Sequence, residues 1–240
     1  MNDPELYTVA NSLQKKAAVQ CLNEYAKKIH WKNIGDSAID LGCGDGSVTV
    51  ILKKYMPSNY KKLVACDISE KAVKYANEHH SDEATMFRVM DIQGDLPQEM
   101  NSAFHHVFSF YALHWIRNQE KAFRNIYNLL EEGGDCLLTF LGYTPIYSVY
   151  NVLAQCSKWK SWLKDVNTFI SPYHDMQVHP LLDISPTQVS PQRTLQLSRI
   201  HWITATLIRS SVLVVLMLRL PVPGRHSRTH TIAVVFYEQR

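Results

Sequence analysis

Residues 37–52 read SAIDLGCGDGSVTVIL, and this stretch decides the fold. An apolar strand ends in the acid Asp40, glycines alternate at Gly42, Gly44 and Gly46, and an apolar helix start follows. Glycine lets the backbone pass close to a ligand because it has no Cβ. The free N–H groups at a helix start can face a polar or anionic group. We therefore expect a ligand-binding strand–turn–helix unit here.

The spacing of the glycines separates two kinds of binding turn. A dinucleotide fingerprint, G-x-G-x-x-G, would need glycine at position 47, where this chain has Ser47. The pattern present is D-x-G-x-G-x-G, which resembles motif I of the class I S-adenosylmethionine (SAM) methyltransferases.

Two further apolar runs also end in acids. Residues 62–67, KLVACD, end at Asp67, and residues 86–92, MFRVMDI, contain Asp91 followed by Ile92. An acid after the second strand can accept hydrogen bonds from a ribose diol. Asp91 could accept one from an adenine amino group while Ile92 packs on the ring. The alternative for Asp67 alone is a helix N-cap, since SEKAVKYA follows. Capping does not explain three acids at three successive strand ends.

Apolar strands alternate with helical segments along most of the chain. This alternation predicts an α/β fold, a Rossmann-like doubly wound, mostly parallel sheet with helical cap elements and its ligand at the strand C-termini. Gly133-Gly134 is expected to cap the helix before the last of these strands. The expected strands are near 37–41, 62–66, 86–91, 105–110 and 135–142, and the expected helices cover 4–29, 46–55, 69–79 and 118–131.

The chain changes character towards its end, and we divide it into a domain of residues 1–175 and an atypical segment of residues 176–240. Residues 145–170 predict an aromatic-rich helical stretch, either a packed helix or the wall of an acceptor pocket. Beyond about residue 180, lysine disappears. The β-like runs 212–218 and 231–238 could supply closing strands, or this segment is poorly ordered or a non-native reading of the coding sequence.

Charge and cysteines exclude several classes of protein. The net charge of +3 combines +5 over residues 181–240 with −2 over the rest, so it does not indicate a nucleic-acid-binding face. No apolar run approaches the roughly twenty residues of a membrane span. The five cysteines form no C-x-x-C pair, which favours reduced thiols. We expect a cytoplasmic protein without a signal peptide or membrane span; the sequence does not predict its oligomeric state.

The segment FSFYALHW, residues 108–115, follows the fourth strand, where a methyl acceptor would lie. The chain has no N-P-P-Y or D-P-P-Y, no Lys–Glu base pair and no metal-ligand spacing there. The methyl acceptor should therefore need little help in losing a proton. A carboxylic acid fits, because it is already ionised at pH 7. Such an acceptor needs only orientation and desolvation.

Neutral donors suit a carboxylate acceptor, because Lys or Arg would bind it tightly and blunt its nucleophilicity. Trp115 offers an indole N–H and Gln14 an amide. The alternatives are a core aromatic at Trp115 and an ordinary exposed helix residue at Gln14. His114 is the rival, either a general base for a hydroxyl acceptor or a packing residue.

Several longer motifs share one resemblance. LYTVANSLQ, AIDLGCGDG, ACDIS, FSFYALHW, NIYNLL with GGDCLL, and FISPYH together resemble the insect juvenile hormone acid O-methyltransferases over roughly residues 1–175. The resemblance implies a cytosolic enzyme that transfers methyl from SAM to the carboxylate of farnesoic acid or juvenile hormone acid. It implies that Gln14 and Trp115 hold that carboxylate. The SAM contacts it implies are Asp40, Gly42, Asp67, Asp91 and Ile92. The other residues that we expect to bind the cofactor are Cys43, Gly44, Gly46, Ile68, Phe108, Ser109 and Phe110.

Two departures from the family pattern are visible. The usual F-D-x-V at the fourth strand is Phe104-His105-His106-Val107 here, away from the ligand end, so we expect a small effect. The stretch HPLLDISPTQVSPQRT does not match the family, which suggests a truncated or alternative isoform, or a gene-model error, with an incomplete acceptor pocket. Two other functions therefore stay open: methylation of another small carboxylic acid, and a non-catalytic SAM-binding isoform.

Overall fold

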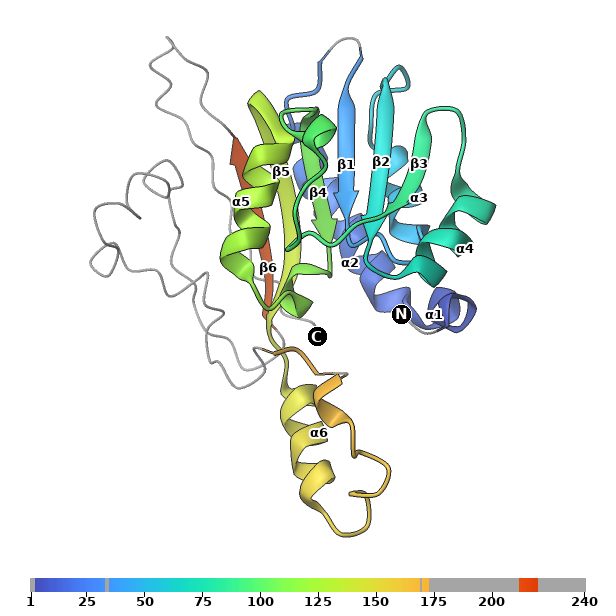
Figure 1. The fold of residues 1–240 in the computed structure, drawn as a ribbon, viewed down its shortest axis with the longest axis vertical. Helices are drawn as coiled ribbons and strands as arrows, with labels where there is room; N and C mark the ends of the chain where they lie inside the picture. Colours follow the sequence, from blue (N-terminus) through green and yellow to red (C-terminus); the bar gives the residue numbers. More distant parts are fainter. Residues whose placement is uncertain (1–2, 33–34, 169, 173–211, 220–240) are drawn as a thin grey trace, which may run out of the picture.

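The computed structural model describes residues 3–32, 35–168, 170–172 and 212–219. It contains one six-stranded sheet in the order β3-β2-β1-β4-β5-β6 (Figure 1). The first five strands are parallel, and β6 runs antiparallel to β5. The strands are β1 Ser37–Leu41, β2 Lys62–Asp67, β3 Thr85–Val89, β4 Phe104–Phe110, β5 Leu130–Tyr143 and β6 Val212–Arg219. The predicted class, an α/β doubly wound sheet, is confirmed.

Helices cover both faces of the sheet, as side-chain alternation along the strands requires. On β1, Ile39 and Leu41 pack with the α5 side, whereas Ala38 packs with the side of α2 and α3. The helices are α1 Pro4–Ala10, α2 Ser12–Tyr25, α3 Ser47–Lys53, α4 Glu70–His80, α5 Gln119–Leu129 and α6 Pro145–Gln155, with short 3-10 turns at Ala26–Lys28, Gln98–Met100, Leu113–Trp115 and Val166–Thr168.

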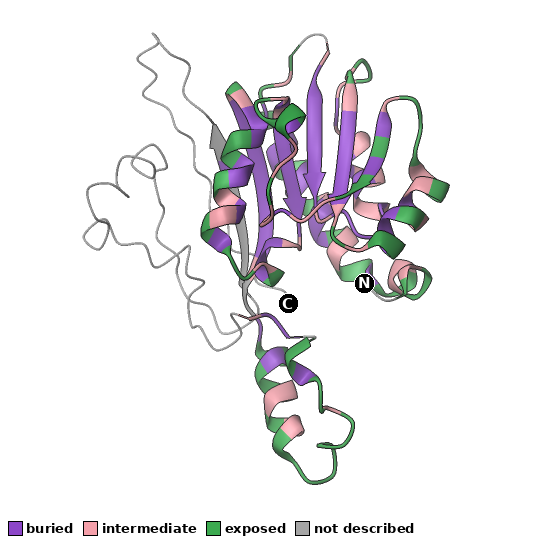
Figure 2. Cartoon of the chain, in the orientation of Figure 1, coloured by how far each residue is buried: buried purple, intermediate pink, exposed green. Residues whose placement is uncertain are grey.

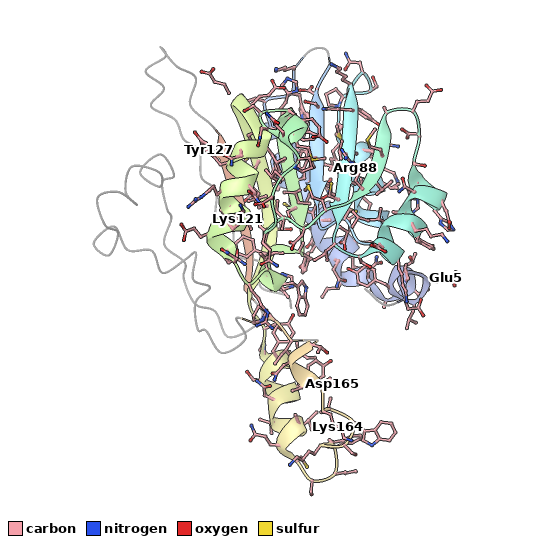
Figure 3. All side chains as sticks on the ribbon, in the orientation of Figure 1. Glu5, Arg88, Lys121, Tyr127, Lys164 and Asp165 are labelled. Atoms are coloured by element: carbon pink, nitrogen blue, oxygen red, sulfur yellow. The ribbon has the colours of Figure 1, made fainter. Side chains whose placement is uncertain are left out.

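Local side-chain chemistry sets several helix boundaries. Ser69 caps α4 by accepting the Ala72 N–H, and Asn118 caps α5 by accepting the Lys121 N–H at 3.0 Å. The outer face of α5 carries Lys121 and Tyr127, away from the sheet (Figure 3). These caps explain why the helices start within one residue of the predicted positions.

The predicted helix cap at Gly133-Gly134 is wrong. Helix α5 ends at Leu129, and β5 begins directly at Leu130, so the glycines lie inside a strand. Gly133 has a φ of 76°, and the β4–β5 register shifts between Phe104 and His106. The glycine pair thus forms an irregularity in the ladder, where left-handed backbone is needed.

Two other element predictions are revised. The predicted helix over 4–29 is divided at Asn11 into α1 and α2. The predicted helical stretch 145–170 is helical mainly over α6, which projects below the sheet and is largely exposed (Figure 2). The run 212–218 does supply a closing strand, β6, whereas 231–238 lies outside the described residues. No helix in the described part of the chain is long and apolar enough to cross a bilayer.

A buried polar triad joins three segments at the amino end of the sheet. His106 Nδ1 lies 2.6 Å from an Asp135 oxygen, and its Nε2 lies 2.9 Å from Asp36 Oδ1. Backbone N–H groups of Lys32 and His30 also donate to these two carboxylates. Burial alone would lower the pKa of His106, but the two carboxylates outweigh burial and raise that pKa. The triad therefore favours a charged imidazole that links β4 and β5 to the segment before β1.

Candidate active site

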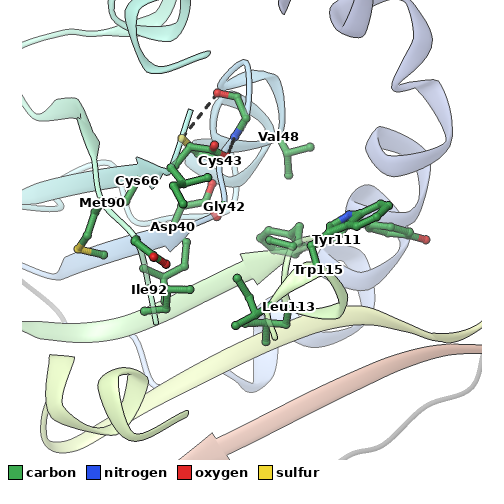
Figure 4. A pocket seen from close by; sticks show the side chains of 18 of the residues that line it. Asp40, Gly42, Cys43, Val48, Cys66, Met90, Ile92, Tyr111, Leu113 and Trp115 are labelled. Carbon is green, nitrogen blue, oxygen red and sulfur yellow. Dashed lines mark hydrogen bonds between the residues drawn. The ribbon is translucent and has the colours of Figure 1, made fainter. Parts of the chain in front are cut away.

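A cavity of about 630 Å³ lies where β1, β2, β3 and β4 end (Figure 4). This is the carboxyl edge of the parallel strands, where ligands bind in such folds. The volume is in the range of small-molecule pockets. The predicted site residues that line it are Gln14, Asp40, Gly42, Cys43, Gly44, Asp67, Ile68, Asp91, Ile92, Phe110 and Trp115.

The glycine turn is built from left-handed backbone. Gly42, Gly44 and Gly46 have φ values of 79°, 56° and 81°. A Cβ on Gly42 would lie 2.1 Å from the Cβ of Ala112, so this glycine lets the turn approach the segment after β4. A Cβ on Gly46 would lie 2.9 Å from Phe87. These two glycines therefore serve close packing within the protein, and Gly46 does not line the cavity.

Asp67 at the end of β2 holds the glycine turn. Its Oδ2 accepts the Gly44 N–H at 2.9 Å, and its Oδ1 accepts the Ser69 N–H at 2.9 Å. The N-cap of α4 is Ser69, so the alternative that Asp67 is that cap is wrong. Each carboxylate oxygen can accept two hydrogen bonds, which leaves acceptor capacity toward the cavity. That capacity suits a vicinal diol.

Asp40 at the end of β1 has a different environment. It is 1% exposed, and its Oδ2 accepts a hydrogen bond from Thr49 Oγ1 at 2.6 Å. Burial raises the pKa of Asp40 to about 7, although the Thr49 hydroxyl opposes that rise. Near neutral pH this carboxyl group can therefore bind either as an acid or as an anion.

Asp91 and Ile92 close the side of the cavity beyond β3. Asp91 Oδ1 accepts the Gln93 N–H at 3.0 Å, and both Asp91 and Ile92 line the cavity. Ile92 is 8% exposed and belongs to the core beneath α5. A carboxylate beside a fixed apolar side chain suits a flat heteroaromatic ring that carries an amino group.

Four predicted site residues do not line the cavity. Gly46 is covered by protein, and Phe108 is buried among α2 side chains. Ser109 donates from its hydroxyl to the Leu41 carbonyl at 2.8 Å. His114 is 2% exposed, and its Nδ1 accepts the Leu141 N–H at 3.4 Å. The packing alternative for His114 thus fits its surroundings.

Gln14 and Trp115 reach the cavity from two different elements, α2 and the 3-10 turn Leu113–Trp115. Gln14 comes from α2, and its buried Oε1 has no hydrogen-bond partner among the described residues. Trp115 follows β4 and is 42% exposed, so it is not a core aromatic. Its ring centroid lies 6.1 Å from that of Tyr147. Two uncharged donors, an amide and an indole, are therefore brought to one pocket.

Comparison with known proteins agrees with this geometry. The methyltransferase domain family matches residues 39–138, which span the glycine turn and all three acids. The chain contains a methyltransferase domain. Juvenile hormone acid O-methyltransferase of Bombyx mori is 63% identical over 175 residues, which cover 73% of this chain and 63% of that protein.

Two further relatives of the methyltransferase domain are informative. Juvenile hormone acid O-methyltransferase of Drosophila melanogaster is 44% identical over 72% of this chain and 60% of its own length. Malonyl-[acyl-carrier protein] O-methyltransferase of Hahella chejuensis is 33% identical over 43% of this chain and 36% of that protein. The resemblance to juvenile hormone acid O-methyltransferases is thus confirmed, and the chain spans less than two thirds of those relatives' length.

The cavity-lining residues that sequence reasoning missed include Tyr7, Asp45 and Tyr111. Tyr111 has a left-handed φ of 58°, and its N–H donates to the Thr139 carbonyl at 2.8 Å. Tyrosine is not a residue type that favours left-handed backbone, so the sequence did not predict this turn at Tyr111. The one available signal was Asp45, an acid inside an otherwise small-residue turn.

Two cysteines also face the cavity of the methyltransferase domain. Cys43 lies in the glycine turn and Cys66 in β2, and both are buried. Burial raises the pKa of the Cys66 thiol to about 12 and holds the pKa of Cys43 well above its usual value. Both side chains are therefore neutral thiols at physiological pH.

These residues fit SAM as the methyl donor. Asp67 and Asp91 keep acceptor capacity toward the cavity, and Asp40 can carry a negative charge there. Ile68, Met90 and Ile92 give apolar surface beside them. A ribose, an adenine ring and a cationic amino acid would each find a group of matching chemistry.

Proposed function

We propose that this chain is a SAM-dependent carboxyl O-methyltransferase that esterifies a sesquiterpenoid acid, either farnesoic acid or juvenile hormone acid. One observation carries the proposal: Gln14 and Trp115 line the same cavity as the glycine turn, Asp67 and Asp91. The 63% identity to the Bombyx mori enzyme supports the choice of acid. The partner is thus a lipid-like small molecule, and the proposed role is in juvenile hormone synthesis in the cytoplasm.

Bound SAM supplies an electrophilic methyl group. The protein's task is to hold a donor and an acceptor together in a space that excludes water. Asp67 and the glycine turn form the donor side: Asp67 accepts the Gly44 N–H and so fixes the turn before any ligand arrives. This preorganisation reduces the ordering that binding must otherwise supply.

Gln14 and Trp115 form the proposed acceptor side. A carboxylate is already ionised at pH 7, so no side chain must remove a proton from it. The indole N–H of Trp115 and the amide of Gln14 can orient its oxygens without a full positive charge. Because neutral donors stabilise the ground-state anion less than Lys or Arg would, the attacking oxygen remains nucleophilic.

One observation favours a second candidate, a SAM-binding isoform that does not turn over. Of the predicted acceptor wall, residues 145–170, only Thr168 lines the cavity within the described part of the chain. An acceptor pocket with little apolar wall would hold a terpenoid tail weakly. Methylation of a different, shorter carboxylic acid is the related alternative.

The deciding experiment incubates the purified chain with radiolabelled SAM and farnesoic acid and measures labelled methyl ester. Calorimetry with S-adenosylhomocysteine is run on the same material. Ester formation with donor binding supports the proposal, and donor binding without ester supports the non-catalytic isoform. If ester forms only from short mono- or dicarboxylates, the substrate is a short acid and not a terpenoid acid. Absence of donor binding by folded protein would refute all three.

A further inference from the structure

Asp45 lies in the glycine turn between Gly44 and Gly46 and is 1% exposed. Its carboxylate accepts hydrogen bonds from Thr8 Oγ1 at 2.7 Å and Asn11 Nδ2 at 3.1 Å. The Ser47 hydroxyl donates a further bond at 2.7 Å. A buried carboxylate is costly unless such donors surround it. This carboxylate is therefore committed to protein groups, two of them 34 and 37 residues earlier in the chain.

Two of these hydrogen bonds tie α1 and its junction with α2 to the glycine turn. Helix α1 has no buried residue, and its apolar side chains Leu6 and Val9 are 66% and 81% exposed. Apart from the half-buried Tyr7, hydrophobic burial therefore contributes little to holding α1. The Thr8 hydroxyl also lies 2.9 Å from the Pro4 carbonyl, but the Asp45 carboxylate is the nearer acceptor and the charged one. Asn11, at the joint between α1 and α2, is 1% exposed.

The attached joint carries two cavity residues. Tyr7 directly precedes Thr8, and Gln14 lies three residues after Asn11, close to one helical turn. Burial first, and then the charges of Asp45 and Asp67, raise the pKa of Tyr7 to about 12, so its phenol stays protonated. A shift of the α1–α2 joint would move both the phenol and the amide relative to the glycine turn.

We propose that Asp45 is a positioning residue that holds Tyr7 and Gln14 in register with the donor side of the cavity. Asp45 does not act as a ligand of the donor. The inference rests on the proposed function, since it assigns Asp45 to the alignment of acceptor with donor. In the ligand-free protein, too, the Asp45 carboxylate keeps α1 docked.

The test variant is Asp45→Asn, which keeps the side-chain shape and turns an acceptor oxygen into a donor facing other donors. The matched control is Asp95→Asn, whose side chain is 99% exposed and pairs with Lys121. The first measurement is hydrogen exchange of the ligand-free chain. We expect amides of residues 6–14 to exchange about ten-fold faster in Asp45→Asn, the effect of one lost bond to a charged group. Amides of β1 and β4 should be unchanged.

The second measurement compares acceptor and donor parameters. For Asp45→Asn we expect KM for farnesoic acid to rise about ten-fold while the Kd for S-adenosylhomocysteine stays within about two-fold. Unchanged hydrogen exchange in residues 6–14 would overturn the proposal. A donor Kd weakened as much as KM would also overturn it, because Asp45 would then contact the donor. If wild type makes no ester, the proposed function fails, and hydrogen exchange still decides the role of Asp45.

Thr8→Val covers the case in which Asp45→Asn does not fold. It removes one donor from a partly buried helix position and leaves the glycine turn intact. We expect faster exchange in residues 6–14 in this variant as well. In a double variant with Asp45→Asn, the Thr8 change should add almost nothing, because the bond is already lost. Additive effects of the two substitutions would contradict the attachment.

Discussion

At the amino end of the sheet, His106 lies between the carboxylates of Asp36 and Asp135, whereas at the carboxyl end Asp40 and Asp67 accept hydrogen bonds from uncharged groups. The first end pairs opposite charges inside the protein and so holds segments together. The second end keeps carboxylate capacity open toward a cavity. The contrast teaches that one sheet can separate the residues that stabilise it from those that bind a ligand.

Breaking the amino end should have the largest effect on stability. His106→Leu leaves two buried carboxylates without their central partner, so we expect a loss of about 3–5 kcal/mol in the free energy of unfolding. Urea unfolding followed by circular dichroism measures it. His79→Leu on the exposed end of α4 is the control and should change stability by less than about 0.5 kcal/mol. A similar small change in His106→Leu would show that the triad is not stabilising.

Removing a donor at the carboxyl end should affect catalysis instead. Trp115→Phe keeps an aromatic ring but loses the indole N–H, so we expect kcat with farnesoic acid to fall about ten-fold or more. The Kd for S-adenosylhomocysteine should stay nearly unchanged, because the proposed role of Trp115 is to orient the acceptor. Steady-state kinetics and calorimetry measure the two quantities. Equal turnover in the variant would remove Trp115 from the site.

Changes at Asp67 should sharpen the distinction between holding the turn and binding the donor. Asp67→Ala removes both the acceptor of the Gly44 N–H and the proposed acceptor of the ribose hydroxyls. We expect donor affinity to weaken by about 1–3 kcal/mol. Asp67→Asn keeps an oxygen that can still accept the Gly44 N–H but is a poorer partner for a diol. We expect it to lose a smaller part of the affinity. Calorimetry with S-adenosylhomocysteine that shows wild-type affinity in both variants would contradict the ribose assignment.

The two ends should both make stability fall with rising pH, in different windows. The pKa of Asp40 is raised by burial to about 7, so the folded state holds a proton that the unfolded state releases from about pH 4 upward. The slope is at most about 1.4 kcal/mol per pH unit between these limits. Asp40→Asn should flatten this decline in urea unfolding at pH 5 and 7. An unchanged slope would argue against a protonated Asp40.

His106 contributes to the same decline at higher pH. Its folded-state pKa is raised by Asp135 and Asp36 in spite of burial, so its stabilising charge is fully present below about pH 6.5. The contribution is lost as the pH rises through the raised pKa. His106→Leu should therefore differ least from wild type in alkaline solution. A larger difference at pH 9 than at pH 6 would contradict a charged imidazole.

Much of the carboxyl end could be predicted from sequence, because its information is local. A glycine turn and acids at strand ends lie within a few residues of the strands that position them, so the sheet and the acids and glycines of the cavity lining follow. Gly133-Gly134 misled because the same dipeptide suits a helix end and a strand irregularity equally well. For the β-like run 212–218 the sequence left a closing strand and a poorly ordered or non-native segment open, and the structure has the strand β6 there.

The missed features depend on contacts between distant segments. Asp45 meets Thr8 and Asn11 only after α1 folds back on the glycine turn. The departure from F-D-x-V at Phe104-His105-His106-Val107 was expected to have a small effect. The partners of His106, which lie 70 and 29 residues away, were not predicted. No local pattern reports such pairings. The effect of the departure on activity remains a prediction.

The buried thiols at Cys43 and Cys66 have a consequence for the reactivity of the cavity wall. A sulfonium methyl group alkylates thiolates readily, and a thiolate lining the donor cavity would compete with any acceptor. Because burial raises the pKa of Cys66 to about 12 and that of Cys43 well above normal, the sulfur atoms keep their protons. A protonated thiol is a poor nucleophile, and its polarizable sulfur can pack beside a ligand in the cavity.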